Sequence, residues 1–221
     1  MQFIADIGNF LGTLQTADLV GGLVVTGAIL VIVKDWRIAL LALAVQYILV
    51  ASLLATLVPP QIALMRVVAG ALAAAILYIT ARRTAPDTRT LSRQERAALP
   101  PPFLIGWPFR AVSLVMVGVS AIALTGVTNF LSVPALFWLV SLWLMGTGLL
   151  ILALTRDVIR FGLGLMTFDA GFGALYLAID TGLAVFGVLL IADLLIALTV
   201  AHLASAPQMK PTRTRRRRGE S

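Results

Sequence analysis

Long runs of apolar residues separated by short polar turns recur along the whole chain. Seven of these runs have about 20 residues, the length at which an α-helix crosses the roughly 30 Å hydrocarbon core of a bilayer. They lie near 17–33, 38–57, 61–80, 110–131, 134–155, 158–178 and 182–204. The alternation of apolar and polar positions that is typical of membrane β-barrels is absent. The pattern therefore predicts seven transmembrane helices.

Composition supports this prediction, because 60% of the residues are hydrophobic, 12% are charged, and the mean hydropathy is +0.99. We expect an all-α polytopic membrane protein in which residues 1–205 form one transmembrane domain, with its longest loop near 81–109. Residues 206–221 form a basic tail. The first ten residues lack the basic segment of a signal peptide, so we expect them to remain as an interfacial lead-in.

The basic residues predict the orientation. With seven crossings, all of the 17 Lys and Arg residues except Arg66 fall on one side of the membrane. The turns on the other side, VPPQ, SVP and AIDTG, contain none. The positive-inside rule then places the amino terminus outside and the carboxyl terminus in the cytoplasm. We expect a multi-pass protein of a prokaryotic inner membrane.

The basic tail has two readings. Arg215, Arg216, Arg217 and Arg218 would suit nucleic acid in a soluble protein, but beside a membrane helix they favour anionic lipid headgroups. We therefore expect no nucleic-acid partner.

Missing residue types exclude several functions. The chain has no Cys and only one His, His202, so thiolate-held iron–sulfur clusters and bis-histidine haem are excluded. A retinal Schiff base needs a lysine deep in the last helix, whereas Lys34 and Lys210 both fall outside the apolar runs. No HExxH, GxSxG or glycine-rich phosphate loop is present. We expect no cofactor, no metal site and no catalytic site in this chain.

Charges inside the apolar runs are the candidate functional residues. Asp193 lies about 16 Å into the run 182–204, and Asp169 reaches a similar depth from the other side in the antiparallel run 158–178. An ionisable Asp at the centre of a membrane helix costs about 2.5–3.5 kcal/mol, so it must face protein or water. Asp193 and Asp169 either take up and release protons or serve as hydrogen-bonding anchors between helices. Arg66, about 8 Å from the outer end of its run, either extends to the interface or pairs with a carboxylate.

The chain also shows a trace of internal duplication. A shift of residues 27–83 by 122 positions places VKDWR on TRDVI, VPPQ on DTGL, and three apolar runs on three others in the same direction. Identity is low, so a parallel three-helix repeat is a hypothesis, with the run 110–131 as the linker that restores direction. In this overlay Tyr47 corresponds to Asp169 and Ala71 to Asp193.

The segment from LTRDVIRFGLGLMTFDAGFGALYLAID to TGLAVFGVLLIADLLIALTV resembles the small antiporter-like subunit of respiratory complex I, chain 4L or the K-type subunit. The whole chain more closely resembles hydrogenase-4 component E. The resemblance rests on the basic turn, the GLGLM entry and the AD pair midway along the last run, and it implies that Asp193 matches an acid of the family's central proton axis. The family's second acid would fall at Gly164 or Thr167, neither of which is acidic, and Asp169 lies about one turn away.

These observations predict a membrane subunit of a larger energy-converting complex, similar to complex I or a membrane-bound hydrogenase. Asp193, Asp169 and Arg66 would contribute to a proton or cation path, and the chain would be a non-catalytic subunit of an oxidoreductase complex whose partners are other membrane subunits. The alternative is a structural or assembly subunit of a respiratory or photosynthetic complex, in which the acids are anchors.

Overall fold

The structure, a computed structural model, describes residues 16–84, 106–127, 134–179 and 182–205. In these ranges it is all-helical. It contains seven helices and no strand: α2 (Thr16–Ile32), α3 (Trp36–Leu54), α4 (Pro60–Thr84), α6 (Trp107–Val127), α7 (Ala135–Leu154), α8 (Val158–Ile179) and α9 (Leu183–Ser205). The prediction of an all-α fold is confirmed for this part of the chain. The tail 206–221 and most of the loop 81–109 lie outside the described residues.

Six of the described helices are long and apolar enough to cross a membrane. The chain is therefore a multi-pass membrane protein by the length and composition of its helices. The first helix, α2, has 17 residues and is about 26 Å long, slightly less than the hydrocarbon core. Several boundaries differ from those expected: α3 ends at Leu54 rather than near 57, α4 continues to Thr84 rather than ending near 80, and α6 begins at Trp107 rather than near 110.

Local chemistry explains several helix ends. The side chain of Asp35 accepts a hydrogen bond from the backbone N–H of Arg37 at 2.9 Å and caps the start of α3. Pro108 is the second residue of α6, where a missing N–H costs nothing because no intrahelical acceptor exists for it. Pro134 immediately precedes α7.

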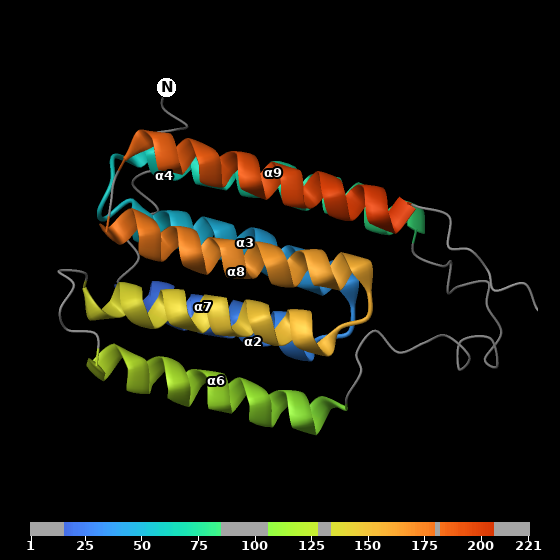
Figure 1. Cartoon of the computed structure of the whole chain (residues 1–221), viewed down its shortest axis with the longest axis horizontal. Helices are drawn as coiled ribbons and strands as arrows, with labels where there is room; N and C mark the ends of the chain where they lie inside the picture. Colours follow the sequence, from blue (N-terminus) through green and yellow to red (C-terminus); the bar gives the residue numbers. More distant parts are fainter. Residues whose placement is uncertain (1–15, 85–105, 128–133, 180–181, 206–221) are drawn as a thin grey trace, which may run out of the picture.

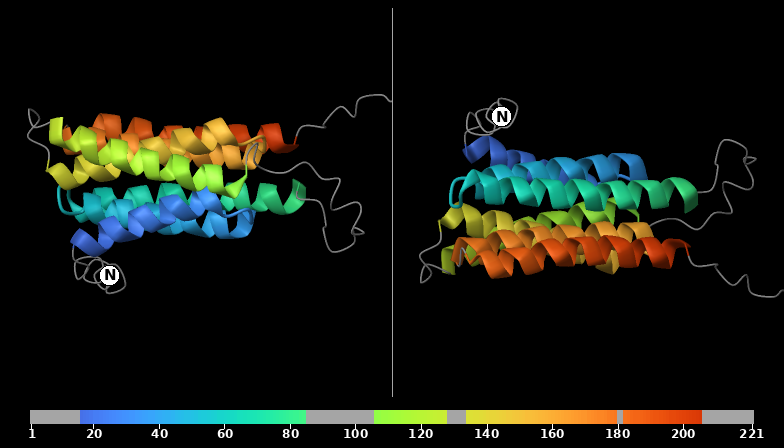
Figure 2. Two further views of the ribbon diagram at one scale, coloured as in Figure 1. Left: turned by 90° about the horizontal axis from the view of Figure 1, so that it is seen from below. Right: turned by 90° about the horizontal axis from the view of Figure 1, so that it is seen from above.

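The helices form two layers (Figures 1 and 2). One layer holds α2, α3 and α4, and the other holds α7, α8 and α9, with neighbours in sequence packed side by side in each. Across the layers α2 packs on α7, α3 on α8 and α4 on α9, and the members of each pair run in the same direction (Figure 1). The remaining helix, α6, lies at the edge against α7 and α2.

Glycines let α7 and α8 approach closely. A Cβ atom on Gly148 of α7 would lie 2.6 Å from the backbone nitrogen of Phe168, and one on Gly171 of α8 would lie 2.8 Å from the backbone nitrogen of Met145. At these separations the contact is between two backbones, which is how small residues pack helices in membranes.

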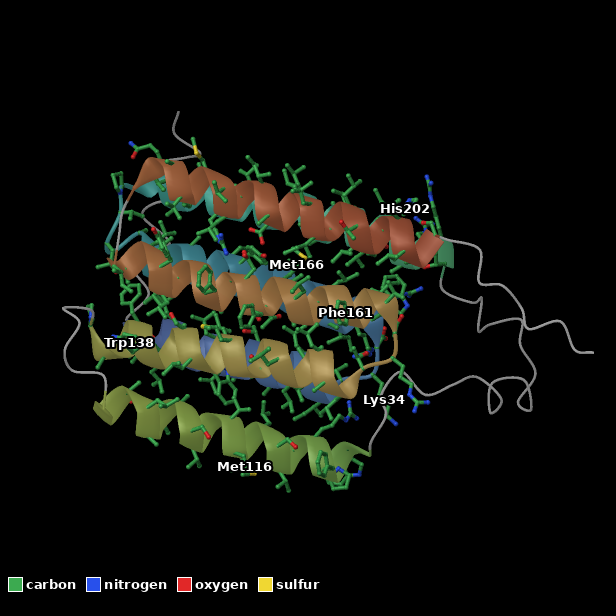
Figure 3. All side chains as sticks on the ribbon, in the orientation of Figure 1. Lys34, Met116, Trp138, Phe161, Met166 and His202 are labelled. Atoms are coloured by element: carbon green, nitrogen blue, oxygen red, sulfur yellow. The ribbon has the colours of Figure 1, made fainter. Side chains whose placement is uncertain are left out.

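The basic side chains gather at one end of the bundle. Among the described residues, every Lys and Arg except Arg66 belongs to the end that contains the turn between α2 and α3, the turn between α7 and α8, the last turn of α4 and the first turn of α6. Lys34 and His202 mark this end in Figure 3. Large apolar side chains are exposed along the helices, such as Met116 on α6 at 66%, as expected for surfaces that meet hydrocarbon.

Candidate functional site

Four helices each contribute one polar side chain to a buried cluster. The cluster consists of Tyr47 from α3, Arg66 from α4, Asp169 from α8 and Asp193 from α9. It lies where the pair α3 and α8 meets the pair α4 and α9. The cluster therefore joins the two layers at one point.

Helix geometry places the cluster near the middle of the helices. Asp193 is the eleventh residue of α9, and Asp169 lies ten residues before the end of α8, so each is about 15 Å from the same end of the bundle. Arg66, the seventh residue of α4, begins about 9 Å from that end. Its side chain must extend inward by roughly the length of one helical turn to reach the two carboxylates.

Arg66 makes its tightest ion pair with Asp169. Nη2 of Arg66 lies 3.0 Å from Oδ2 of Asp169, and the same nitrogen donates to the main-chain oxygen of Asp169 at 3.2 Å. Nη1 of Arg66 lies 3.6 Å from Oδ2 of Asp193. That separation is within range for an ion pair and beyond a normal hydrogen bond.

Tyr47 supplies the hydrogen bond to the second carboxylate. Its hydroxyl donates to Oδ1 of Asp193 at 2.5 Å, a length typical of an O–H donor to an ionised acceptor. The Tyr47 ring also lies under the guanidinium, with Cζ of Arg66 5.7 Å from the ring centroid, which is within the range of a cation–π contact. Tyr47 thus contacts the positive and the negative partner at once.

Two glycines make room for these side chains. A Cβ atom on Gly70 of α4 would lie 2.2 Å from Cδ1 of the Tyr47 ring, and one on Gly173 of α8 would lie 2.8 Å from Nη2 of Arg66. The aromatic ring and the guanidinium therefore lie directly against helix backbone. An alanine at either position would displace a member of the cluster.

The cluster is closed to its surroundings except at one residue. Arg66 and Asp193 are 0% exposed and Tyr47 is 1% exposed, whereas the Asp169 side chain is 13% exposed. The cluster carries one guanidinium and two carboxylates, so with all three ionised it holds one excess negative charge. Such a charge away from water is costly unless a proton or a cation neutralises it.

The structure shows where the three predicted residues lie, and their role in a proton or cation path stays a prediction. Asp193 faces protein rather than lipid, as expected, and Asp169 lies at the same level because both acids contact Arg66. Of the two alternatives for Arg66, pairing with a carboxylate is the one observed. Tyr47 was not among the predicted site residues. Its sequence signals were a polar hydroxyl within an apolar run, which could line a hydrated path, and its equivalence to Asp169 in the repeat overlay.

Among the other described polar residues of the helices, some bond to their own backbone and others have no hydrogen-bond partner. The Thr167 and Thr125 hydroxyls donate to the carbonyls of Leu163 and Ile122 in their own helices, which is the ordinary role of Thr in membrane helices. Gln46, next to Tyr47, is 0% exposed, and both polar atoms of its amide lack a hydrogen bond in the described structure.

Two further buried arginines hold the turn between α2 and α3. Arg110 of α6 donates to the Val31 carbonyl at 2.9 Å, and Arg160 of α8 donates to the carbonyls of Val33 at 2.8 Å and of Lys34. They satisfy carbonyls at the end of α2 that have no intrahelical donor, and their charge suits the negative end of the helix dipole. The sequence explained both residues only as markers of orientation.

The described residues offer no group of side chains that would bind a metal ion. No cluster of three or more His, Asp or Glu side chains that would suit a metal ion occurs in the described ranges, and both acids of the central cluster already face Arg66. In comparisons with known proteins, no family model, no curated protein and no solved structure matches this chain.

Proposed function

We propose that this chain is a membrane subunit of a larger energy-converting complex and that the cluster of Tyr47, Arg66, Asp169 and Asp193 takes up and releases a proton within the membrane. The observation that carries the proposal is the charge balance of the cluster. One guanidinium faces the buried carboxylate of Asp193 and the partly exposed carboxylate of Asp169, so a single proton converts a net negative cluster into a neutral one. The most favourable occupancy at this depth is therefore one proton for the two acids.

Tyr47 supports proton transfer rather than a static ion pair. A hydroxyl can donate to a carboxylate and can also accept a proton from a neighbouring group. Its bond to Oδ1 leaves Oδ2 of Asp193 facing Nη1 of Arg66 at 3.6 Å. A proton that arrives on Asp193 weakens this ion pair, while the ion pair of Arg66 with Asp169 at 3.0 Å still compensates the guanidinium.

Asp169 is the reason to propose a partner subunit. It is the one member of the cluster with a partly exposed side chain, at 13%, and it lies in the middle of a membrane-spanning helix. A carboxylate that meets hydrocarbon is strongly disfavoured. A neighbouring membrane subunit with a polar or basic side chain at this level would cover Asp169 and continue the path for a proton or cation.

We also propose the orientation and the repeat. The end that carries the described basic residues faces the cytoplasm of a prokaryotic cell, as the positive-inside rule favours. The three pairs α2 with α7, α3 with α8 and α4 with α9 support a parallel duplication. In this duplication Tyr47 and Asp169 are equivalent residues on paired helices. We also propose, as a separate point, that the chain is related to hydrogenase-4 component E and the K-type subunit.

The test is proton translocation by the complex that co-purifies with this chain, reconstituted in proteoliposomes with an internal pH-sensitive dye. Asp193→Asn keeps the shape and an oxygen that accepts from Tyr47 and removes the group that binds the proton. We expect translocation to fall to background while the complex still assembles. Asp35→Asn is the matched control, because Asn also caps a helix start, and we expect it to translocate normally.

A structural or assembly role is the second candidate, and one observation favours it: Arg66 and Asp193 are 0% exposed, so the cluster links α3, α4, α8 and α9 like an anchor. In that case Asp193→Asn would leave translocation unchanged while Asp193→Leu would block assembly, because Leu leaves the Tyr47 hydroxyl without its acceptor. That pair of results would overturn the proton-carrying proposal.

A further inference from the structure

An aromatic and basic surface lies where α3 begins and α4 ends, far from the central cluster. The rings of Trp36 on α3 and Tyr78 on α4 are in contact, with centroids 5.8 Å apart and planes inclined at 47°. The guanidinium of Arg37 lies over the Trp36 ring, with Cζ 5.3 Å from its centroid. Arg82 follows Tyr78 by four residues, which places it on the same face of α4 one turn nearer the helix end.

We propose that this surface is a binding site for the headgroup of an anionic phospholipid. Trp and Tyr prefer the headgroup level of a bilayer, since their rings have an apolar body and a polar edge. Arginine binds phosphate oxygens through two parallel N–H donors. The Arg37 guanidinium stacks on the face of the Trp36 ring, which leaves the N–H donors at the edge of the guanidinium available to a phosphate.

The charges of the surface suit an anion. Lys34, Arg37, Arg82 and Arg83 are all exposed at this end, and Asp35 is the acid among them. The Asp35 carboxylate already accepts the backbone N–H of Arg37 at 2.9 Å, so it is engaged in capping α3. The net local charge is positive, which favours a headgroup with a net negative charge over a zwitterionic one, whose ammonium balances its phosphate.

The turn that carries this surface is fixed in place. The carbonyls of Val33 and Lys34 accept hydrogen bonds from Arg160 of α8. Ordering the turn before the ligand arrives lowers the entropy lost on binding. A headgroup would therefore meet side chains that project from a held backbone.

An apolar stripe leads from the headgroup site toward the middle of the membrane. Leu41, Val45 and Ile48 follow Arg37 at helical spacing on α3 and are 67%, 39% and 42% exposed. An acyl chain that lies along this stripe would keep its phosphate beside Arg37. This continuity favours a phospholipid over a free anion, and it does not depend on the proposed function of the central cluster.

The test is native mass spectrometry of the full-length protein with equal amounts of phosphatidylglycerol and phosphatidylethanolamine. We expect the wild type to retain phosphatidylglycerol preferentially. Each basic residue near a membrane surface is worth about 1 kcal/mol, so we expect Arg37→Gln to reduce the preference about fivefold and Arg37→Gln with Arg82→Gln about twentyfold or more. Arg156→Gln is the matched control, because it removes one exposed charge from the same end of the bundle and should change the preference much less.

Three results would overturn the proposal. They are an equal effect of Arg37→Gln and Arg156→Gln, an absence of preference in the wild type, and displacement of phosphatidylglycerol by inorganic phosphate. A second measurement does not depend on the stability of the arginine variants. Phosphatidylglycerol with brominated acyl chains should quench the tryptophan fluorescence of the wild type more than brominated phosphatidylethanolamine, and Trp36→Phe should abolish that difference. If the difference persists in Trp36→Phe, the lipid lies elsewhere.

Discussion

At the scale of single residues, the Tyr47 ring fits only because the residue beneath it, Gly70, has no side chain. Gly70 lies directly under the ring, where a Cβ atom would be 2.2 Å from Cδ1. We expect Gly70→Ala to displace the ring, stretch the hydrogen bond to Asp193 and destabilise the protein by about 1–3 kcal/mol. The midpoint of thermal unfolding in detergent, followed by intrinsic tryptophan fluorescence, measures this effect.

Gly187 on α9 is the control, because a Cβ atom there would have no neighbour within 4 Å. Gly187→Ala should raise the midpoint slightly, since Ala is favoured over Gly in a helix by about 1 kcal/mol. Equal midpoints for the two variants would show that the Tyr47 ring is not packed against α4 as described.

The charge balance of the cluster gives a second prediction at this scale. Arg66→Gln leaves the buried Asp193 and the partly exposed Asp169 without a cation, and removing one partner of a buried ion pair costs about 3–5 kcal/mol. We expect a large loss of folded protein in membrane extracts and a lower unfolding midpoint. Adding Asp169→Asn and Asp193→Asn to Arg66→Gln removes all three charges and should recover most of the yield, because a neutral polar cluster costs less to bury.

The triple variant makes this prediction independent of side-chain packing. Gln at position 66 is present in both variants, so only the charges differ between them. A triple variant that is no more abundant than Arg66→Gln would mean that the guanidinium matters through its shape and contacts instead of its charge.

At the scale of helices, α7 and α8 approach each other backbone to backbone. A Cβ atom on Gly148 would lie 2.6 Å from the backbone nitrogen and 2.8 Å from the Cα of Phe168, as well as 2.7 Å from the carbonyl oxygen of Gly164. Because these are backbone atoms, they cannot move aside as a flexible side chain can. We expect Gly148→Ala to separate the helices and to cost at least about 3 kcal/mol, the upper end for overpacking.

Gly126 of α6 is the matched position, since no atom lies within 4 Å of a Cβ atom built there. The unfolding midpoint of Gly126→Ala should match the wild type or exceed it. A Gly148→Ala variant as stable as Gly126→Ala would contradict the close packing of α7 on α8.

The helices themselves were the part of the structure that the sequence could predict. An apolar run of membrane-spanning length has few alternatives to a helix, so all seven predicted segments correspond to helices among the described residues, with ends shifted by a few residues. The end of α4 was missed because Ala81 to Thr84 are polar on average and still continue the helix beyond the apolar run. The start of α6 was missed because Trp107 and Pro108 precede the apolar run, although Pro fits the first turn of a helix.

Only the charged residues of the candidate site could be predicted from the sequence. Asp193, Asp169 and Arg66 stand out because each interrupts an apolar run, and the cost of burial demands a partner. The identity of the partners depends on how each helix is rotated, and nearly uniform apolar helices carry little information on rotation. For the same reason Tyr47 was missed, and Arg110 and Arg160, which lie near predicted helix ends, were not expected to be buried.

At the scale of the whole molecule, one question is how the bundle crosses the membrane. The positive-inside rule depends on the asymmetry of Lys and Arg between the two sides. All described basic residues except Arg66 are at one end, and Arg66 is compensated by its carboxylates inside the bundle. The charge difference between the ends therefore does not depend on the ionised cluster.

The proposed sidedness rests on this asymmetry. It can be measured directly by labelling a single introduced thiol, because the chain has no Cys of its own to react. Arg156→Cys places the thiol in the turn between α7 and α8, and Leu57→Cys places it in the turn between α3 and α4, where Leu57 is 39% exposed. We expect a membrane-impermeant maleimide to label Leu57→Cys in intact bacterial spheroplasts and Arg156→Cys only after the membrane is permeabilised. The opposite result would place the basic end outside, where the membrane potential and the leaflet charge both disfavour it, and would require another signal to override the basic residues. Labelling of both variants from the same side would be a stronger contradiction, because the two turns lie at opposite ends of the bundle (Figure 1), and at least one described helix would then fail to cross.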